Sequence, residues 1–175
     1  MLKSIAQKVQ IYGRSHMNGC FTVQFPLIRK FWFYGAPFMY AGEVGNGFKV
    51  KCATEQPGAA DFTIPSVDFG VPTDEDMLKG VEAAIIAAFN GQPVFAGCMG
   101  GIGRTGTFLS VVLKVLQPDL PASQIVSTIR QVYLSHAVET KGQKELIERI
   151  DVSALRRKIK WLWLAAVWRR MRGRA

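Results

Sequence analysis

Residues 94–106 read Val-Phe-Ala-Gly-Cys-Met-Gly-Gly-Ile-Gly-Arg-Thr-Gly, and this stretch joins two apolar segments. Residues 92–96 form a short, mainly apolar segment before the loop, which predicts a buried strand. Residues 107–116, after it, are apolar on nearly every side, which predicts a buried central helix. A strand, a glycine-rich loop and a helix in this order indicate an α/β domain.

The loop between the two segments predicts an anion-binding site. Glycines at positions 100, 101 and 103 allow successive backbone N–H groups to point at one centre, and the helix N-terminus adds partial positive charge. A thiol in this setting, Cys98, favours the nucleophilic thiolate form. Arg104 can bind two oxygens of a phosphate, and Thr105 can donate its hydroxyl to the sulfur. The loop therefore predicts nucleophilic attack on a phosphoryl group.

The spacing of cysteine and arginine alone is a weak signal, because a chain of this composition contains it by chance in about one case in five. The glycines, Thr105-Gly106 and the flanking apolar segments carry the prediction. The alternative is a buried structural cysteine in front of a glycine-rich turn.

The elements around the loop extend the α/β pattern. Short segments rich in aromatic and β-branched residues predict strands at 5–12, 21–25, 31–34 and 48–52. Thr73 followed by three acidic residues predicts the start of an amphipathic helix that ends near Gly91. Further helices are expected at 123–133 and from about residue 142. We expect a central mixed β-sheet flanked by α-helices, with the phosphate-binding loop between a strand and a buried helix.

Three segments together resemble protein tyrosine phosphatases. Cys98–Gly106 resembles the family's signature loop, and Ser66-Val-Asp68-Phe-Gly-Val-Pro72 resembles its mobile acid loop, usually Trp-Pro-Asp-Phe-Gly-Val-Pro. Val138-Glu-Thr140-Lys-Gly-Gln143 is similar to the family's Val-Gln-Thr-x-x-Gln segment. The three occur in the family's order, and the chain length is close to that of compact or dual-specificity members.

The resemblance implies a phosphatase that hydrolyses phosphotyrosine, with phosphoserine and phosphothreonine as further candidates, through a phosphocysteine intermediate. Cys98 is then the nucleophile, Asp68 the general acid and base, and Gln143 a group that positions water. The phosphate would bind to Arg104 and to the loop residues Met99, Gly100, Gly101, Ile102 and Gly103. The simpler interpretations are that Asp68 begins a turn and that Gln143 is solvated on a helix surface.

The chain departs from the family pattern at several positions. Gly97 stands where His usually precedes the nucleophile, Ser66 and Val67 replace Trp-Pro, and Glu139 replaces the first Gln. An Arg common before that segment appears as Leu134, and Arg130 is expected to be exposed or paired with an acid. Because of these differences, a phosphate-binding pseudophosphatase remains an alternative to an active enzyme. A phosphoinositide phosphatase is the other alternative, although the loop lacks the Lys common in enzymes for such substrates.

The positive charge is concentrated in the tail. The net charge is +9, yet eight Lys or Arg and no acid lie from Arg156 onward, so the first 155 residues carry only +1. We divide the chain into a phosphatase domain, 1–154, and a basic, Trp-rich helix, 155–175. Its tryptophans either pack on the domain or place Arg156–Arg174 on an anionic membrane surface. Nucleic acid is not expected, because no recognition motif accompanies the charge.

The cysteines and histidines indicate the expected cellular compartment and the need for cofactors. Three cysteines, none close to another in sequence, favour a reducing compartment, and the N-terminus lacks the apolar run of a signal peptide. We therefore expect a cytoplasmic or peripheral membrane protein. His16 and His136 have no metal-ligand spacing, so neither a metal nor another cofactor is expected.

Overall fold

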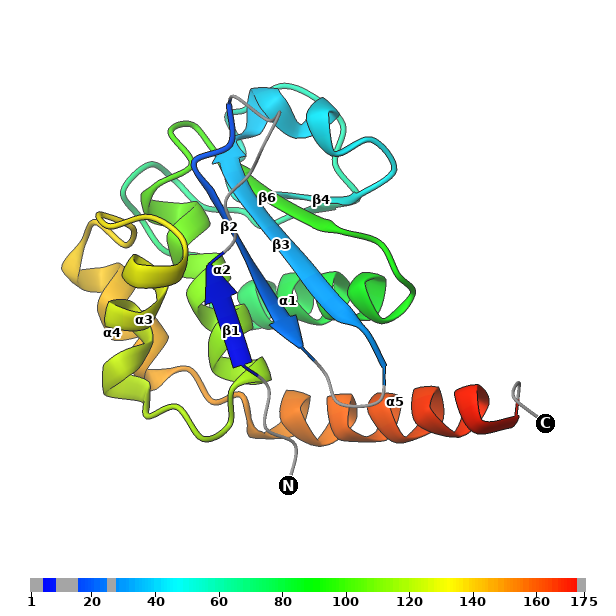
Figure 1. The fold of residues 1–175 in the computed structure, drawn as a ribbon. Coiled ribbons are helices and arrows are strands. Elements are labelled where there is room, and N and C mark those ends of the chain that lie inside the picture. Colours follow the sequence, from blue (N-terminus) through cyan, green and yellow to red (C-terminus); the bar gives the residue numbers. More distant parts are fainter. Residues whose placement is uncertain (1–4, 9–15, 25–27, 173–175) are drawn as a thin grey trace.

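The computed structural model describes residues 5–8, 16–24 and 28–172, which form a six-stranded sheet with helices packed on it (Figure 1). The strand order is β1-β2-β3-β6-β4-β5. The first three pair antiparallel, whereas β3, β6, β4 and β5 pair parallel. The predicted mixed α/β sheet is therefore confirmed. The strands are β1 Ile5–Lys8, β2 Gly19–Gln24, β3 Lys30–Pro37, β4 Phe48–Lys51, β5 Phe62–Thr63 and β6 Val94–Cys98.

The α-helices pack on one face of this sheet, and all of them except α1 follow β6 in sequence. α1 begins where predicted, because the Thr73 hydroxyl accepts a hydrogen bond from the Asp76 N–H at 3.1 Å. α2 begins four residues earlier than predicted, so that Arg104 lies in its first turn. Two 3-10 helices, η1 and η2, were not predicted. The helices are η1 Phe38–Val44, α1 Asp74–Phe89, α2 Gly103–Leu116, η2 Ala122–Gln124, α3 Ile125–Val132, α4 Lys141–Arg149 and α5 Ser153–Arg172.

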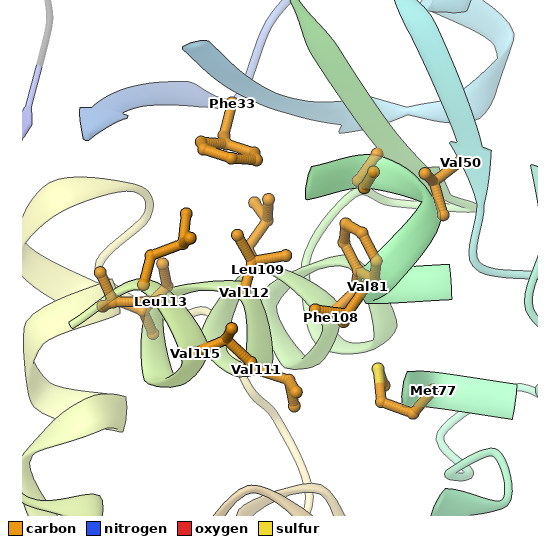
Figure 2. Packing of buried hydrophobic residues seen from close by; sticks show 14 of the residues in the cluster. Phe33, Val50, Met77, Val81, Phe108, Leu109, Val111, Val112, Leu113 and Val115 are labelled. Carbon is orange, nitrogen blue, oxygen red and sulfur yellow. The ribbon is translucent and has the colours of Figure 1, made fainter. Parts of the chain in front are cut away.

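The main core lies between the sheet and α2. All residues of α2 are buried, as its apolar composition predicted. Figure 2 shows Phe33 of the sheet pointing toward Leu109 and Val112 of α2. Alternate residues of β6 serve opposite faces: Val94 and Ala96 join this core, whereas Phe95 joins a smaller cluster with η1 on the other face. Packing on both faces thereby fixes the orientation of β6 and the position of Cys98 at its end.

A buried lysine fixes the far end of α2. Lys114 is 8% exposed, and its ammonium donates hydrogen bonds to the carbonyls of Ile147, Glu148 and Ile150 at 2.7, 2.9 and 3.0 Å. These carbonyls end α4, where backbone acceptors lack partners within the helix. The lysine thus joins α2 to the C-terminus of α4.

The tail forms the long helix α5, which begins at Ser153. Its first half packs on the domain, because Leu155 and Ile159 are buried in the main core. Trp161 and Trp168 do not pack there: they are 72% and 50% exposed. No helix in the described part of the chain combines the length and apolarity needed to cross a bilayer.

Candidate active site

The signature loop lies at the carboxyl edge of the parallel strands, between β6 and α2. β6 pairs with β3 on one side and β4 on the other, and Cys98 is its last residue. A cavity of about 160 Å³ opens above the loop. The residues that line it are Asp68, Phe69, Cys98, Met99, Gly100, Ile102, Gly103, Arg104, Glu139 and Gln143. The fold thus brings three separate sequence segments to one cavity, whereas Gly101 and Thr105 do not line it.

Two side chains hold the loop from outside the cavity. The Asn18 amide donates to the Gly100 carbonyl at 2.8 Å, and the buried Tyr133 hydroxyl donates to the Gly101 carbonyl at 2.6 Å. Burial, followed by the nearby Cys98, raises the pKa of Tyr133 far above its ordinary value, so the phenol stays a donor. These two hydrogen bonds hold the carbonyls of Gly100 and Gly101 and so fix the conformation of the loop. Neither residue belongs to a motif, and sequence reasoning missed both.

Close packing explains why glycine precedes the nucleophile. A Cβ added to Gly97 would lie 2.7 Å from the Phe38 Cα and 2.9 Å from the Ala36 carbonyl oxygen. These are backbone atoms at the junction of β3 and η1, and they cannot move aside as a flexible side chain could. The position therefore has no room for the histidine usual in the family, and Asn18 and Tyr133 order the loop instead.

Arg104 is the buried cation of the cavity. Its side chain is 3% exposed, and its guanidinium contacts Glu55 at 2.6 Å and Asp68 at 2.9 Å. One guanidinium nitrogen also donates to the Ser66 carbonyl at 3.0 Å. Because both carboxylates come from loops, a phosphate can compete with them for the same donors. The guanidinium thus links the acid loop to the signature loop.

Glu55 is a site residue that sequence reasoning missed. Its loop follows β4, where the Lys51 ammonium donates to the carbonyls of Gln56 at 3.1 Å and Gly58 at 3.0 Å. Burial alone would raise the pKa of the Glu55 carboxyl, but hydrogen bonds from its own backbone N–H and from Arg104, together with the charge of Arg104, lower it. A single glutamate between strands carries no sequence signal for this role.

Asp68 lies at the cavity, as its place in the acid-loop motif predicted. Its side chain is 62% exposed, and one carboxylate oxygen accepts from the Phe69 N–H at 3.1 Å as well as from Arg104. Phe69 has φ +56°, a left-handed conformation that is uncommon away from glycine and that often occurs at functional sites. Asp68 is therefore more than the first residue of a turn: it contacts the cation of the cavity.

Gln143 is fully buried rather than solvated on a helix surface. Its carbonyl oxygen accepts from the N–H groups of Glu139 at 2.8 Å and Thr140 at 3.3 Å, which completes a capping box at the start of α4. Its amide nitrogen is buried without a hydrogen-bond partner among the described residues. Because Gln143 lines the cavity, this nitrogen can donate to a water or a phosphate oxygen there.

The expectation for Arg130 was wrong. Its guanidinium donates to the backbone carbonyls of Ala137 and Val138, each at 3.0 Å, instead of facing solvent or an acid. Val138 has φ +64°, which is strained for a β-branched residue. Arg130 therefore stabilises the turn that presents Glu139 and Gln143 to the cavity.

Two further polar groups, the Thr105 hydroxyl and the Cys52 thiol, lie beside the loop. The Thr105 hydroxyl is buried without a partner among the described residues, so its predicted bond to the sulfur is not formed here. Cys52 lies beside the nucleophile, with its N–H donating to the Gly97 carbonyl at 2.7 Å. Burial and then the neighbouring Cys98 raise the pKa of the Cys52 thiol, which favours its protonated form. Within the described ranges, no group of three or more His, Cys, Asp or Glu residues could hold a metal ion.

Comparison with known proteins finds relatives in sequence and in structure. No family model matches the chain. Two uncharacterized proteins of Methanocaldococcus jannaschii, MJECL20 and MJ0215, are 36% and 34% identical over 84 residues, or 48% of this chain. The chain spans about half the length of these curated relatives, which the matches cover to 54% and 50%.

Solved structures share the fold. The active form of Tk-PTP is 26% identical, with a TM-score of 0.55 over 68% of this chain and 92% of that one. DUSP15 is 16% identical, with a TM-score of 0.59 over 73% of this chain and 90% of its own. The catalytic core of the PP-IP phosphatase SIW14 from S. cerevisiae is 17% identical, with a TM-score of 0.55 over 75% and 89%.

Proposed function

We propose that this chain, which shares the fold of protein tyrosine phosphatases, hydrolyses phosphotyrosine in proteins through a phosphocysteine intermediate on Cys98. One observation carries the proposal: Cys98, Arg104 and Asp68 line a single cavity although they come from distant segments. A nucleophile, an anion-binding fork and a proton donor are the three groups that phosphoryl transfer through cysteine needs.

The first step transfers the phosphoryl group to the enzyme. The Cys98 thiolate forms a bond to phosphorus while the bond from phosphorus to the tyrosine oxygen breaks. Asp68 gives its proton to that oxygen, so that a neutral phenol leaves. Arg104 and the loop N–H groups bind the phosphoryl oxygens, where negative charge collects in the transition state.

The second step returns the free enzyme. Water attacks phosphorus, the bond between phosphorus and sulfur breaks, and Asp68 accepts the proton of the water. Gln143 lines the same cavity, and its unpartnered amide nitrogen can hold the attacking water. Inorganic phosphate leaves, and Cys98 returns to the thiolate.

The rim of the cavity favours an aromatic phosphate ester. Phe69 and Met99 line the cavity and are 62% and 56% exposed, which places two apolar side chains beside the entrance. A phenyl ring can pack between such groups, whereas the short side chain of phosphoserine leaves them in water. We therefore rank phosphotyrosine above phosphoserine and phosphothreonine.

Electrostatics favour a protein substrate over an inositol phosphate. Asp68 and Glu139 both line the cavity, Glu55 pairs with Arg104, and the loop from Cys98 to Arg104 contains no lysine. A substrate with several phosphates would meet these carboxylates with little cationic compensation. The pseudophosphatase alternative rests on the same ion pairs, because Arg104 already has two carboxylate partners.

A side-by-side assay tests the proposal. We expect the purified chain to hydrolyse a phosphotyrosine peptide at least about tenfold faster, in kcat/KM, than a phosphoserine peptide or a phosphoinositide. Cys98→Ser should abolish hydrolysis, whereas Cys20→Ser, the matched control at a buried cysteine outside the cavity, should keep it. Turnover by Cys98→Ser would overturn the mechanism, and phosphopeptide binding without turnover would establish a pseudophosphatase.

A further inference from the structure

Helix α5 has two apolar faces, and only one of them is used by the fold. Leu155 and Ile159 enter the main core, and Trp163 packs against it. The other face carries four large apolar side chains that are 72%, 40%, 50% and 61% exposed: Trp161, Leu164, Trp168 and Met171. Their spacing of three or four residues aligns them along one side of a helix. We call these four residues the outer stripe.

Positive charge surrounds the outer stripe. α5 contains seven Lys or Arg and no Asp or Glu. Exposed cations lie before the stripe and near its end: Arg157, Lys160, Arg169 and Arg172. Arg172 also stacks over the Trp168 ring at 3.7 Å from its centroid. An apolar strip on a helix that carries cations and no acidic residue is complementary to a surface that is apolar inside and anionic at its edge.

The helix is held firmly enough to act as a platform. Lys158 forms an ion pair with Glu82 on α1, and Arg156 donates to the Lys114 carbonyl of α2 at 2.6 Å. Together with the burial of Leu155 and Ile159, these contacts fix the rotation of α5 about its own axis. The outer stripe therefore points to solvent because of the fold.

We infer that the outer stripe of α5 binds an anionic lipid surface, with the helix lying along the membrane interface. Twenty residues of helix extend for about 30 Å, and tryptophan and arginine are the residues that favour the headgroup region. A nucleic acid would engage the cations but would gain nothing from Leu164 and Met171. The proposal concerns attachment and goes beyond the proposed phosphatase activity.

This attachment would also set the orientation of the cavity, an inference that rests on the proposed function. Arg104 lies in the first turn of α2, and Lys114, which Arg156 contacts, lies ten residues later. Ten residues of helix separate the two ends by about 15 Å. Figure 1 shows α5 at the end of the sheet opposite the loop that joins β6 to α2. The docked enzyme would present its cavity away from the bilayer, toward phosphorylated proteins.

Vesicle binding tests the inference. The probe is a phosphatidylcholine vesicle with about one-third phosphatidylserine, compared with pure phosphatidylcholine. We expect the full chain to sediment with the anionic vesicles, with a blue shift of tryptophan emission, and to bind neutral vesicles at least about tenfold more weakly. Trp161→Ala/Trp168→Ala should reduce anionic binding at least about tenfold, whereas the control Trp32→Ala, on β3, should not.

Several outcomes would overturn the inference. These are equal binding by the double variant and the parent, equal binding to neutral and anionic vesicles, or tighter binding to duplex DNA or RNA than to anionic vesicles. Because the mutated tryptophans are exposed, circular dichroism should show an unchanged fold. Hydrolysis of an aryl phosphate by the double variant should equal that of the parent, which separates failure of attachment from failure of the phosphatase proposal.

A second readout tests the orientation. A phosphoinositide embedded in the anionic vesicles should be hydrolysed no faster than its short-chain, dispersed form. Faster hydrolysis in the bilayer would show that the cavity faces the membrane and would contradict the orientation.

Discussion

The two ends of α2 each carry a buried cation, and their partners differ in kind. Lys114, in the last turn, donates to three backbone carbonyls. Arg104, in the first turn, is held mainly by the carboxylates of Glu55 and Asp68, which belong to loops. Backbone partners are fixed by secondary structure, whereas side chains on loops can be displaced. A buried cation with displaceable partners is suited to bind a ligand, and one with fixed partners is suited to hold the fold.

Buried hydrogen-bond donors without partners among the described residues occur at both ends of α2. Near Arg104, the Thr105 hydroxyl and the Gln143 amide nitrogen are buried without partners among the described residues. At the other end, the Lys114 ammonium uses all three of its donors. Gln117 Nε2 and Arg156 Nε, at the Lys114 end, are also buried without partners among the described residues. Of these donors, the Gln143 nitrogen belongs to a residue that lines the cavity, where a substrate or water can accept from it.

Arg104→Lys should cause the largest effect, because it keeps the charge and removes the two-pronged donor geometry. We expect kcat/KM for a phosphotyrosine peptide to fall about 10³-fold, equivalent to about 4 kcal/mol of transition-state stabilisation. Steady-state kinetics measures the loss, and thermal unfolding should show a midpoint within a few degrees of the parent. Retained activity would show that Arg104 is not needed to bind the phosphate and would contradict the contrast with Lys114.

Lys114→Met should have the opposite pattern. The change leaves three buried carbonyls without their donor, so we expect the free energy of unfolding in urea to fall by about 3 kcal/mol. kcat/KM per folded molecule should stay within about twofold of the parent. A loss of activity without a loss of stability would place this end of the helix in the catalytic machinery.

Asp68→Asn tests whether the carboxylate beside Arg104 transfers protons. Asparagine can still accept a hydrogen bond from Arg104, but it cannot supply a proton to the leaving group. We expect about a 10²-fold loss of kcat with a phosphotyrosine peptide, or about 2.7 kcal/mol. The loss should shrink with nitrophenyl phosphate, whose phenolate leaves without help. Equal losses for both esters would point to a role in positioning Arg104 alone.

Glu55→Gln should give the smallest effect, because this carboxylate is partly exposed and shares Arg104 with other partners. We expect kcat/KM to change by about two- to fivefold. The pKa of Glu55 is lowered in the folded protein, so its ionised form stabilises the fold above the ordinary value of 4.5. That contribution is lost as pH falls through the lowered pKa. The unfolding free energy of the variant should therefore fall less on acidification than that of the parent, and an identical acid dependence would contradict the ion pair.

Local pattern predicted the part of the site that is contiguous in sequence. The apolar strand, the glycines and the buried helix around Cys98 all follow from residue order, as does the Thr73 cap of α1. Asp68 and Gln143 could be placed only by resemblance to the acid loop and to the third segment. Their meeting at one cavity depends on the packing of the whole sheet.

Long-range contacts account for what the sequence did not predict. Glu55, Asn18 and Tyr133 act through single contacts with residues distant in the chain, and no spacing marks them. Arg130 was misjudged because its partners are backbone carbonyls, which carry no residue identity. The glycine at position 97 had no explanation from sequence, and the backbone of Phe38 supplies one.

The most direct test of the central claim is to trap the phosphorylated enzyme. The chain is mixed with a phosphotyrosine peptide, quenched in acid within one turnover, digested and examined by mass spectrometry. We predict one phosphoryl group on the peptide that contains Cys98, and none on the peptides that contain Cys20 or Cys52. Turnover by the parent chain without phosphate on Cys98 would contradict the account.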